Sequence, residues 1–269
     1  MPAGACLLCP ICFQRHYHRC VEILVMLGGE LLCTANNRSY RLGTGDILLL
    51  NPYTLHQGEP AAPNCHYLCL TFLLDNILKY PNSVLSSCAE SVENGGGFFD
   101  EFYSAGDTDT RSIGELSEQI HACLNKNTPS HELAVLSAIY RLMEILYSRH
   151  YREAPQNASR KRSAAFMQKL SQYLSQHYAE PITAKDAAKA LFMSASHFSH
   201  LIRQNFGVSF SKYLCEQRII YAMKYHFGSE LSIKDIATAV GFNDYCYFSR
   251  SFKKYVGQSP AFYFKKWKG

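Results

Sequence analysis

Long hydrophobic runs are absent from this sequence, and both glycine and proline are scarce. Its 269 residues include 16 Gly and 10 Pro, too few for a fibrous or low-complexity chain. No segment approaches the roughly 18 consecutive apolar residues of a transmembrane helix, and the first residues lack the basic start of a secretory signal. We therefore expect a soluble, cytoplasmic protein with no membrane partner.

The composition is that of a folded protein with reduced cysteines. Hydrophobic residues make up 47% of the chain, which is enough to bury a core and excludes wholesale disorder. The 11 cysteines are odd in number, and most lie in apolar runs, as Cys33, Cys65, Cys69 and Cys123 do. Such thiols indicate core packing in a reducing compartment rather than a disulfide framework.

Three cysteines repeat at every third position near the N-terminus. Cys6, Cys9 and Cys12, with Cys20 or His16 as a fourth ligand, have a spacing that a metal or cluster site could use. A fourth cysteine at the same spacing is missing, so the pattern is incomplete. We expect a flexible N-terminal segment with reduced thiols instead.

Charge is distributed very unevenly along the chain. The net charge of +5 is the sum of −6 through Ser159 and +11 from Arg160 onward. The change falls in a polar segment with one proline, residues 152–162, which we predict to be a linker. An acidic half joined to a strongly basic half indicates two domains, of which the basic one binds a polyanion.

The basic half contains two copies of one helix–turn–helix pattern. In the first copy Thr183 and Ser194 are placed to cap a short and a longer helix. In the second copy Ser232 and Asp244 take the same places. A connecting helix over 210–227 would be roughly 27 Å long. Since successive major grooves on one face of a duplex lie about 34 Å apart, such a rod could place the two longer helices in adjacent grooves.

The outward faces of the two longer helices supply the candidate DNA contacts, because arginine can bond a guanine edge and serine or histidine can bond bases or phosphates. Lysines, an asparagine and a tyrosine beside these faces are candidates for positioning the DNA backbone. The complete set is Ser196, Ser199, His200, Arg203, Lys212, Asn243, Tyr245, Cys246, Ser249, Arg250, Lys253 and Lys254.

Residues 233–260 closely resemble the second DNA-binding signature of the AraC family of bacterial transcription regulators. Residues 193–202 and 207–210, with Arg218 downstream, resemble the first. Cys246 stands where the family often has serine, and His200 where it often has arginine. These departures affect which bases are read and not whether DNA is bound. The resemblance implies a regulator of transcription that binds promoter DNA and contacts RNA polymerase.

The N-terminal half has short apolar strands at 22–27, 47–50 and 66–74, separated by glycine- and asparagine-rich turns. This spacing predicts an antiparallel barrel. His16, His18 and Glu22 in one segment, and His56 in another, resemble the two cupin-type motifs in sensor domains of AraC-type regulators.

Histidines and a glutamate at this spacing suit a cupin metal site, or line a polar pocket for a small molecule. The second motif departs from the metal-binding pattern, and the resemblance implies sensor barrels without metal. We therefore expect no metal or cofactor but an effector, for which a hydroxylated ligand such as a sugar would suit the side chains. The effector-binding candidates are His16, His18, Glu22, His56 and Tyr67.

Beyond the barrel, helices are expected over 112–125 and from a cap at Ser130 onward. The second carries an apolar seam that suits a partner helix, and the resemblance implies that such helices form a homodimer. The seam consists of Leu133, Leu136, Tyr140, Met143 and Tyr147.

The sequence thus predicts a two-domain α+β protein: a cupin-like antiparallel β-barrel with helices, then an all-α domain with two helix-turn-helix motifs. The expected ranges are 1–151 for sensing and dimerisation, 152–162 for the linker and 163–269 for DNA binding. We expect a dimeric, effector-modulated, sequence-specific DNA-binding transcription regulator that is not an enzyme. A metal-dependent cupin enzyme fused to a DNA-binding module and an effector-independent regulator are the alternatives.

Overall fold

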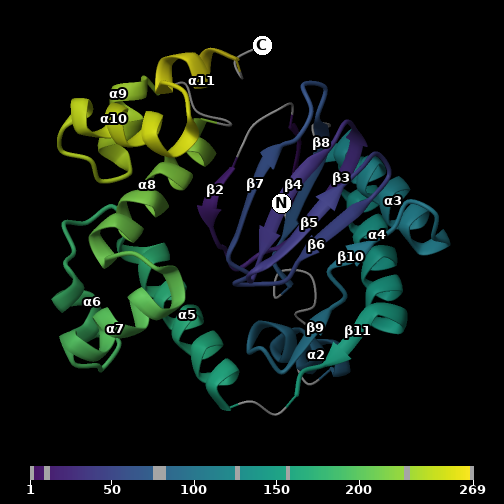
Figure 1. The fold of residues 1–269 in the computed structure, drawn as a ribbon, viewed down its shortest axis with the longest axis horizontal. Helices are drawn as coiled ribbons and strands as arrows, with labels where there is room; N and C mark the ends of the chain where they lie inside the picture. Colours follow the sequence, from purple (N-terminus) through teal and green to yellow (C-terminus); the bar gives the residue numbers. More distant parts are fainter. Residues whose placement is uncertain are drawn as a thin grey trace. The chain divides into compact units, whose positions relative to one another are not determined.

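The computed structural model describes residues 3–8, 13–74, 83–124, 128–155, 158–226 and 231–266. The chain folds as two compact units, Met1–Ala165 and Phe166–Gly269, which are drawn with their element labels in Figure 1. None of the helices in these described ranges is long and apolar enough to cross a membrane.

The N-terminal unit is built on two antiparallel sheets, as the strand pattern predicted. The larger sheet has the order β1 (Ala3–Leu8), β8 (His66–Phe72), β3 (Val21–Gly28), β6 (Ile47–Leu50) and β10 (Phe102–Tyr103). The smaller sheet has the order β2 (Phe13–His16), β7 (His56–Pro60), β4 (Leu31–Ala35) and β5 (Arg38–Leu42). Asn36 and Asn37 form the predicted turn between β4 and β5, both with positive φ.

The first strand corrects the expectation of a flexible N-terminal segment. Residues Ala3–Leu8 form β1 and pair without a break with β8. An edge of a sheet offers unpaired backbone groups, and this segment is apolar enough to add to it. In the register of this pair Cys6 lies opposite Cys69. Cys9 and Cys12 lie outside the described residues.

Alternation along the central strand β3 divides its side chains between two cores. Ile23 and Val25 pack on one face, in a cluster that includes the helices. Leu24 and Met26 pack on the other face, against β4 and β5 of the smaller sheet. Glu22 shares the parity of Leu24, so this carboxylate lies between the sheets.

The helices of this unit begin earlier than the sequence predicted. Helix α3 spans Thr108–Leu124 and α4 spans Pro129–Ile145. Thr128, not Ser130, caps α4, because its side chain accepts from His131 N and Pro129 suits the first helical turn. The π-helical turn η1 (Leu146–His150) follows directly.

Three shorter elements complete the N-terminal unit. They are helix α2 (Val84–Glu93) and the paired strands β9 (Gly97–Phe99) and β11 (Tyr151–Glu153). Residues 152–162, predicted to be a linker, contain the end of β11 and the start of α5 (Ala158–His177). Alanine, lysine and arginine in that segment favour a helix, so α5 begins before the predicted start at residue 163.

The C-terminal unit contains the two predicted helix–turn–helix copies. They are α6 (Ala184–Ala190) with α7 (Ala195–Phe206), and α9 (Ile233–Ala239) with α10 (Tyr245–Val256). Helix α8 (Phe210–His226) connects them, and α11 (Pro260–Lys266) ends the unit. Phe198 and Ile202 of α7 and Phe248 and Phe252 of α10 are buried, whereas Leu201 is half-buried.

Candidate functional site

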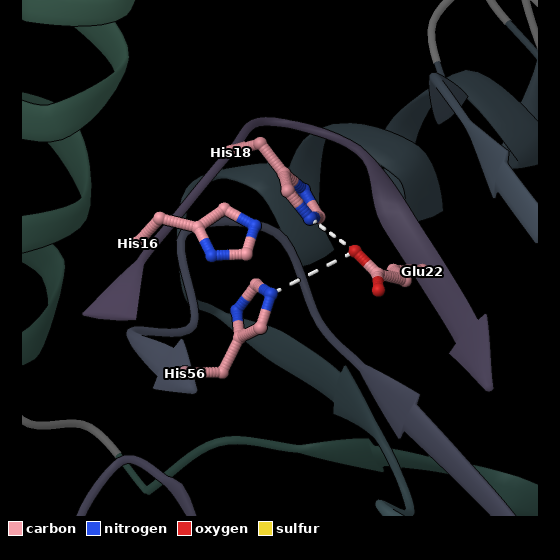
Figure 2. Close-up of side chains that lie close together, drawn as sticks. All are labelled: His16, His18, Glu22 and His56. Carbon is pink, nitrogen blue, oxygen red and sulfur yellow. Dashed lines mark hydrogen bonds and ion pairs between the residues drawn. The ribbon is translucent and has the colours of Figure 1, made fainter. Parts of the chain in front are cut away.

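Three imidazoles and one carboxylate meet at one corner of the N-terminal unit (Figure 2). His16 ends β2, His18 lies in the connection to β3, Glu22 belongs to β3, and His56 begins β7. His16 and His56 face each other in the register of β2 and β7. One donor atom of each residue lies within 4.8 Å of the others, so four of the five predicted effector residues are neighbours in space.

The Glu22 carboxylate is the centre of this cluster. Its Oε2 atom lies 2.5 Å from His18 Nε2 and 3.7 Å from His56 Nε2. The thiol of Cys69 donates to Oε1 at 3.4 Å. Burial alone would raise the pKa of Glu22, but the hydrogen bond to His18 and the three neighbouring imidazoles lower it well below its ordinary range. The cluster therefore holds a buried anion.

Backbone carbonyl groups orient two of the imidazoles. His18 Nδ1 lies 3.1 Å from the carbonyl oxygen of Cys20, and His56 Nδ1 lies 2.8 Å from that of Thr54. Burial, followed by the charge of His16, holds the pKa of His56 well below its ordinary value. Neutral His56 thus carries its proton on Nδ1 and turns the lone pair of Nε2 toward the cluster.

Phe13 and Cys69 are parts of this corner that sequence reasoning missed. The Phe13 ring lies edge-on to His56 and to Tyr67, with ring centroids 5.7 Å and 6.4 Å apart. Gly58, its partner in the β2–β7 register, leaves room for the ring, since a Cβ there would come within 2.4 Å of it. Tyr67 is fully buried in the core between the sheets.

Side-chain caps shape both helix–turn–helix copies of the C-terminal unit. Ser194 accepts from His197 N at the start of α7, and Asp244 accepts from Tyr247 N at the start of α10. Gly207 and Gly257 end these helices in the left-handed conformation. The caps fall where the sequence pattern predicted them, and the two glycines satisfy the conformational demand of the helix ends.

The predicted DNA-contact residues lie on the outer surface of the C-terminal unit. Ser199 and Ser249 are half-buried. The exposed members are Ser196, His200, Arg203, Lys212, Asn243, Tyr245, Cys246, Arg250, Lys253 and Lys254. Since the buried faces of α7 and α10 hold phenylalanines, each helix turns its polar and basic side outward. The 17 residues of α8 make a connecting rod of about 25 Å.

The apolar seam predicted on α4 is divided in the structure. Leu133 is 66% exposed and Tyr140 is 37% exposed, and Leu136 is half-buried. Met143 is buried, and Tyr147 packs against the same core with its ring 5.0 Å from that of Phe99. Only the first half of the seam is therefore open to a partner, because the second half packs on the unit's own core.

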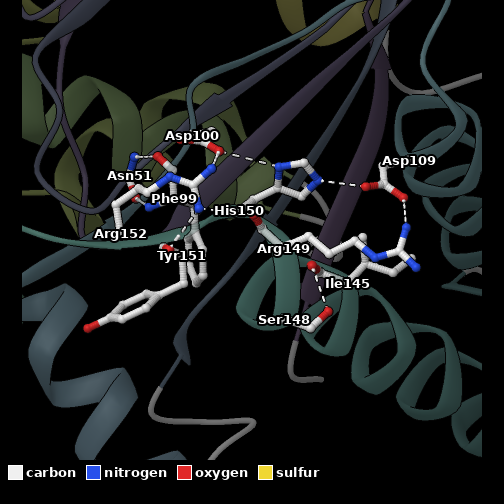
Figure 3. A network of polar contacts seen from close by, with 10 residues as sticks. All are labelled: Asn51, Phe99, Asp100, Asp109, Ile145, Ser148, Arg149, His150, Tyr151 and Arg152. Carbon is white, nitrogen blue, oxygen red and sulfur yellow. Dashed lines mark hydrogen bonds and ion pairs between the residues drawn. The ribbon is translucent and has the colours of Figure 1, made fainter.

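A polar network holds the end of the N-terminal unit, just before the chain enters α5 (Figure 3). His150 lies between two aspartates, with Nε2 3.1 Å from Asp109 and Nδ1 3.4 Å from Asp100. Arg149 pairs with Asp109 at 2.5 Å, and Arg152 of β11 pairs with Asp100 at 2.8 Å. These contacts tie η1 and β11 to the loop after β9 and to α3.

Each unit matches a known protein family. Residues 12–143 match the AraC-like ligand binding domain, and residues 187–266 match a helix-turn-helix domain. The chain belongs to the AraC family of transcription regulators. It is thus an effector-modulated DNA-binding regulator, in which a ligand-binding domain precedes the helix-turn-helix domain.

Several known proteins resemble the chain over most of its length. The Msm operon regulatory protein of Streptococcus mutans is 25% identical over 242 residues, 88% of this chain and 81% of its own length. The transcriptional activator RhaS of Enterobacter sp. is 23% identical, over 92% of this chain and 86% of its own length. The structure of ToxT from Vibrio cholerae O395 covers 100% of this chain and 99% of its own, with a TM-score of 0.67 and 15% identity. That last likeness shows a shared fold.

Proposed function

We propose that this regulator reads a promoter duplex with α7 and α10, responds to an effector at the His16, His18, Glu22 and His56 cluster, and forms a homodimer through α4. RNA polymerase is the further partner expected at a promoter. The N-terminal range 1–151 would sense and dimerise, and 163–269 would bind DNA. The observation that carries the DNA-binding part is the repeated outward polar face on two helices of the same construction.

The chemistry of these two faces supports sequence-specific reading. Arg203 on α7 and Arg250 on α10 are exposed, and a guanidinium can donate two hydrogen bonds to one guanine. Lys253 and Lys254 follow on the exposed last turn of α10, where lysine suits phosphate contacts. The net charge of +11 beyond Arg160 supplies the sequence-independent attraction.

The connection between the units supports a route for the effector's influence. Helix α4 passes through η1 into β11, and the His150 network holds that segment to Asp100 and Asp109. An effector that shifts the N-terminal core therefore acts on the segment that leads to α5. In a dimer this would change the effective concentration of paired DNA-binding units at two half-sites.

The DNA-binding part is tested with the full chain and a duplex selected by it from a random pool. Arg250→Ala should weaken binding to the selected duplex by about 1–3 kcal/mol and barely change binding to random DNA. The control Arg41→Ala removes an exposed arginine from β5 of the N-terminal unit and should leave both affinities unchanged. If the wild-type protein binds the selected duplex no better than heparin at physiological salt, the proposal is wrong.

The alternative in which the barrel is a metal-dependent enzyme has one observation in its favour, the clustered histidines and glutamate. Two observations favour a sensor: the family match of residues 12–143 to a ligand-binding domain and the full-length relatives named as regulators. A structure of ToxT from Vibrio cholerae contains a bound unsaturated fatty acid, which supports a small-molecule site in a protein of this fold.

A further inference from the structure

The cluster at the corner of the two sheets turns two imidazole nitrogens toward one carboxylate oxygen. A carbonyl oxygen only accepts hydrogen bonds. The Nδ1 atoms of His18 and His56, which face the carbonyls of Cys20 and Thr54, therefore carry hydrogen. The Nε2 atoms of both rings then face the same Glu22 oxygen, to which His18 is hydrogen-bonded at 2.5 Å, whereas His56 lies 3.7 Å away. A proton on His18 Nε2 satisfies only His18 and Glu22, whereas a metal ion among the three atoms would bind His56 as well.

His56 provides the independent observation. Its side chain is 0% exposed, and among the described residues its Nε2 atom has no hydrogen-bond partner. The nearest carboxylate oxygen, Glu22 Oε2, is 3.7 Å away, which is too far for a hydrogen bond. A second proton on His56 would be as unsatisfied as the lone pair is. A buried polar atom without a partner is costly, and a cation at this point would satisfy it.

The spacing of the donors suits a single ion. Ligands at about 2.0–2.1 Å from a tetrahedral zinc ion are about 3.4 Å apart. The separations of Glu22 Oε2 from His18 Nε2 and His56 Nε2, 2.5 Å and 3.7 Å, bracket that value. His16 completes the set, with its ring centroid 4.2 Å from that of His56. Donor atoms of all four residues lie within 4.8 Å of one another.

The surrounding contacts are those of a metal site. Imidazoles that bind metals usually donate their other N–H to a carbonyl or carboxylate, which fixes the ring and its tautomer; His18 and His56 do so. The Cys69 thiol donates to Glu22 Oε1 and leaves Oε2 as the ligand atom. Three imidazoles and one carboxylate select borderline transition metals over Mg²⁺ or Ca²⁺.

We infer that His16, His18, Glu22 and His56 bind one divalent transition-metal ion, and that its occupancy is the signal to which the N-terminal domain responds. The ion would join the smaller sheet, through β2 and β7, to β3 of the larger sheet. The first part stands on the geometry alone, whereas the second rests on the proposed function. This metal site replaces the metal-free pocket that the family resemblance led us to expect.

Metal binding is tested on the full chain after dialysis against a chelator. Zn²⁺ and Co²⁺ are added separately, and bound metal is measured by elemental analysis after desalting. We expect about one tightly held ion per chain and visible absorption bands of Co²⁺ in a tetrahedral nitrogen and oxygen site. His18→Ala, at a half-buried position, should reduce affinity by at least about tenfold. The control His66→Ala removes an imidazole outside the cluster and should bind as the wild type does.

Further measurements separate the possible failures. Wild-type protein that holds no more metal than His18→Ala, or lacks the Co²⁺ bands, overturns the site. If His18→Ala fails to fold, the wild-type Co²⁺ spectrum still decides. Signalling is tested by comparing the affinity of metal-free and Zn²⁺-loaded protein for the selected duplex, with an expected difference of at least about fivefold. Equal affinities overturn the signalling role and leave DNA binding intact, whereas loss of duplex preference in both forms contradicts the proposed function instead.

Discussion

Arg218 of α8 donates a hydrogen bond from Nε to the backbone carbonyl of Tyr178 at 2.7 Å, just beyond the end of α5. Its Nη2 atom donates to the carbonyl of Glu180, also at 2.7 Å. The side chain lies over the ring of Phe242, 5.9 Å from the centroid. One guanidinium on the connecting helix α8 thus holds the segment that follows α5 in place.

Arg218→Lys should destabilise the C-terminal unit by about 1.5–3 kcal/mol, because an ammonium group cannot span both carbonyls and hydrogen bonds to charged groups contribute on this scale. Urea unfolding followed by far-ultraviolet circular dichroism measures this loss, since the described elements of the C-terminal unit are helices. Arg203→Lys, on the exposed face of α7, is the control with the same chemical change. Equal midpoints for the two variants would show that the carbonyl contacts contribute nothing measurable.

Gly241 and Gly257 separate backbone strain from steric clash. Both have positive φ, +92° and +83°, but a Cβ at Gly241 would come within 2.5 Å of the Ala179 carbonyl oxygen, whereas one at Gly257 meets nothing within 4 Å. Gly257→Ala should therefore lose about 1–2 kcal/mol from strain alone. Gly241→Ala should lose clearly more in the same urea experiment. The clash is irrelevant if the two variants are equally stable.

The open half of the α4 seam predicts a dimer contact. Leu133→Asp should shift the protein toward monomer in sedimentation velocity runs, because it places a charge in an apolar contact. Val84→Asp on α2 makes the same change at another exposed position, 79% exposed against 66% for Leu133, and should leave the distribution unchanged. A wild-type protein that sediments as a monomer at all concentrations would contradict the homodimer.

Tyr40 makes the stability of the N-terminal unit depend on pH in alkaline solution. Burial and the hydrogen bond to Glu101 raise the pKa of Tyr40 to about 12, whereas an unfolded tyrosine titrates near 10. Between about pH 10 and 12 the folded state thus binds more protons, and stability falls as pH rises. Tyr40→Phe should flatten this dependence, measured as the urea midpoint by circular dichroism. An unchanged slope would show that other groups cause the loss.

The DNA-binding half could be predicted almost completely from the sequence, because its signals are local. Caps such as Ser194 and Asp244 and stops such as Gly207 and Gly257 act within one helical turn. The periodicity that buries Phe198 and Phe248 repeats every three or four residues. The family signature at 233–260 then indicated what the repeated pattern does.

In the N-terminal half the sequence by itself determined the residue types, the strand alternation and the motif that holds His16, His18, Glu22 and His56. Tertiary structure decided that residues 3–8 pair with β8, that half of the α4 seam is buried, and that Cys69, Cys20 and Thr54 surround the cluster. Strand pairing and helix packing join residues far apart along the chain, so no local pattern records them. Whether two imidazoles turn their Nε2 atoms toward one carboxylate depends on which carbonyls they meet, and only the assembled sheets bring those groups together.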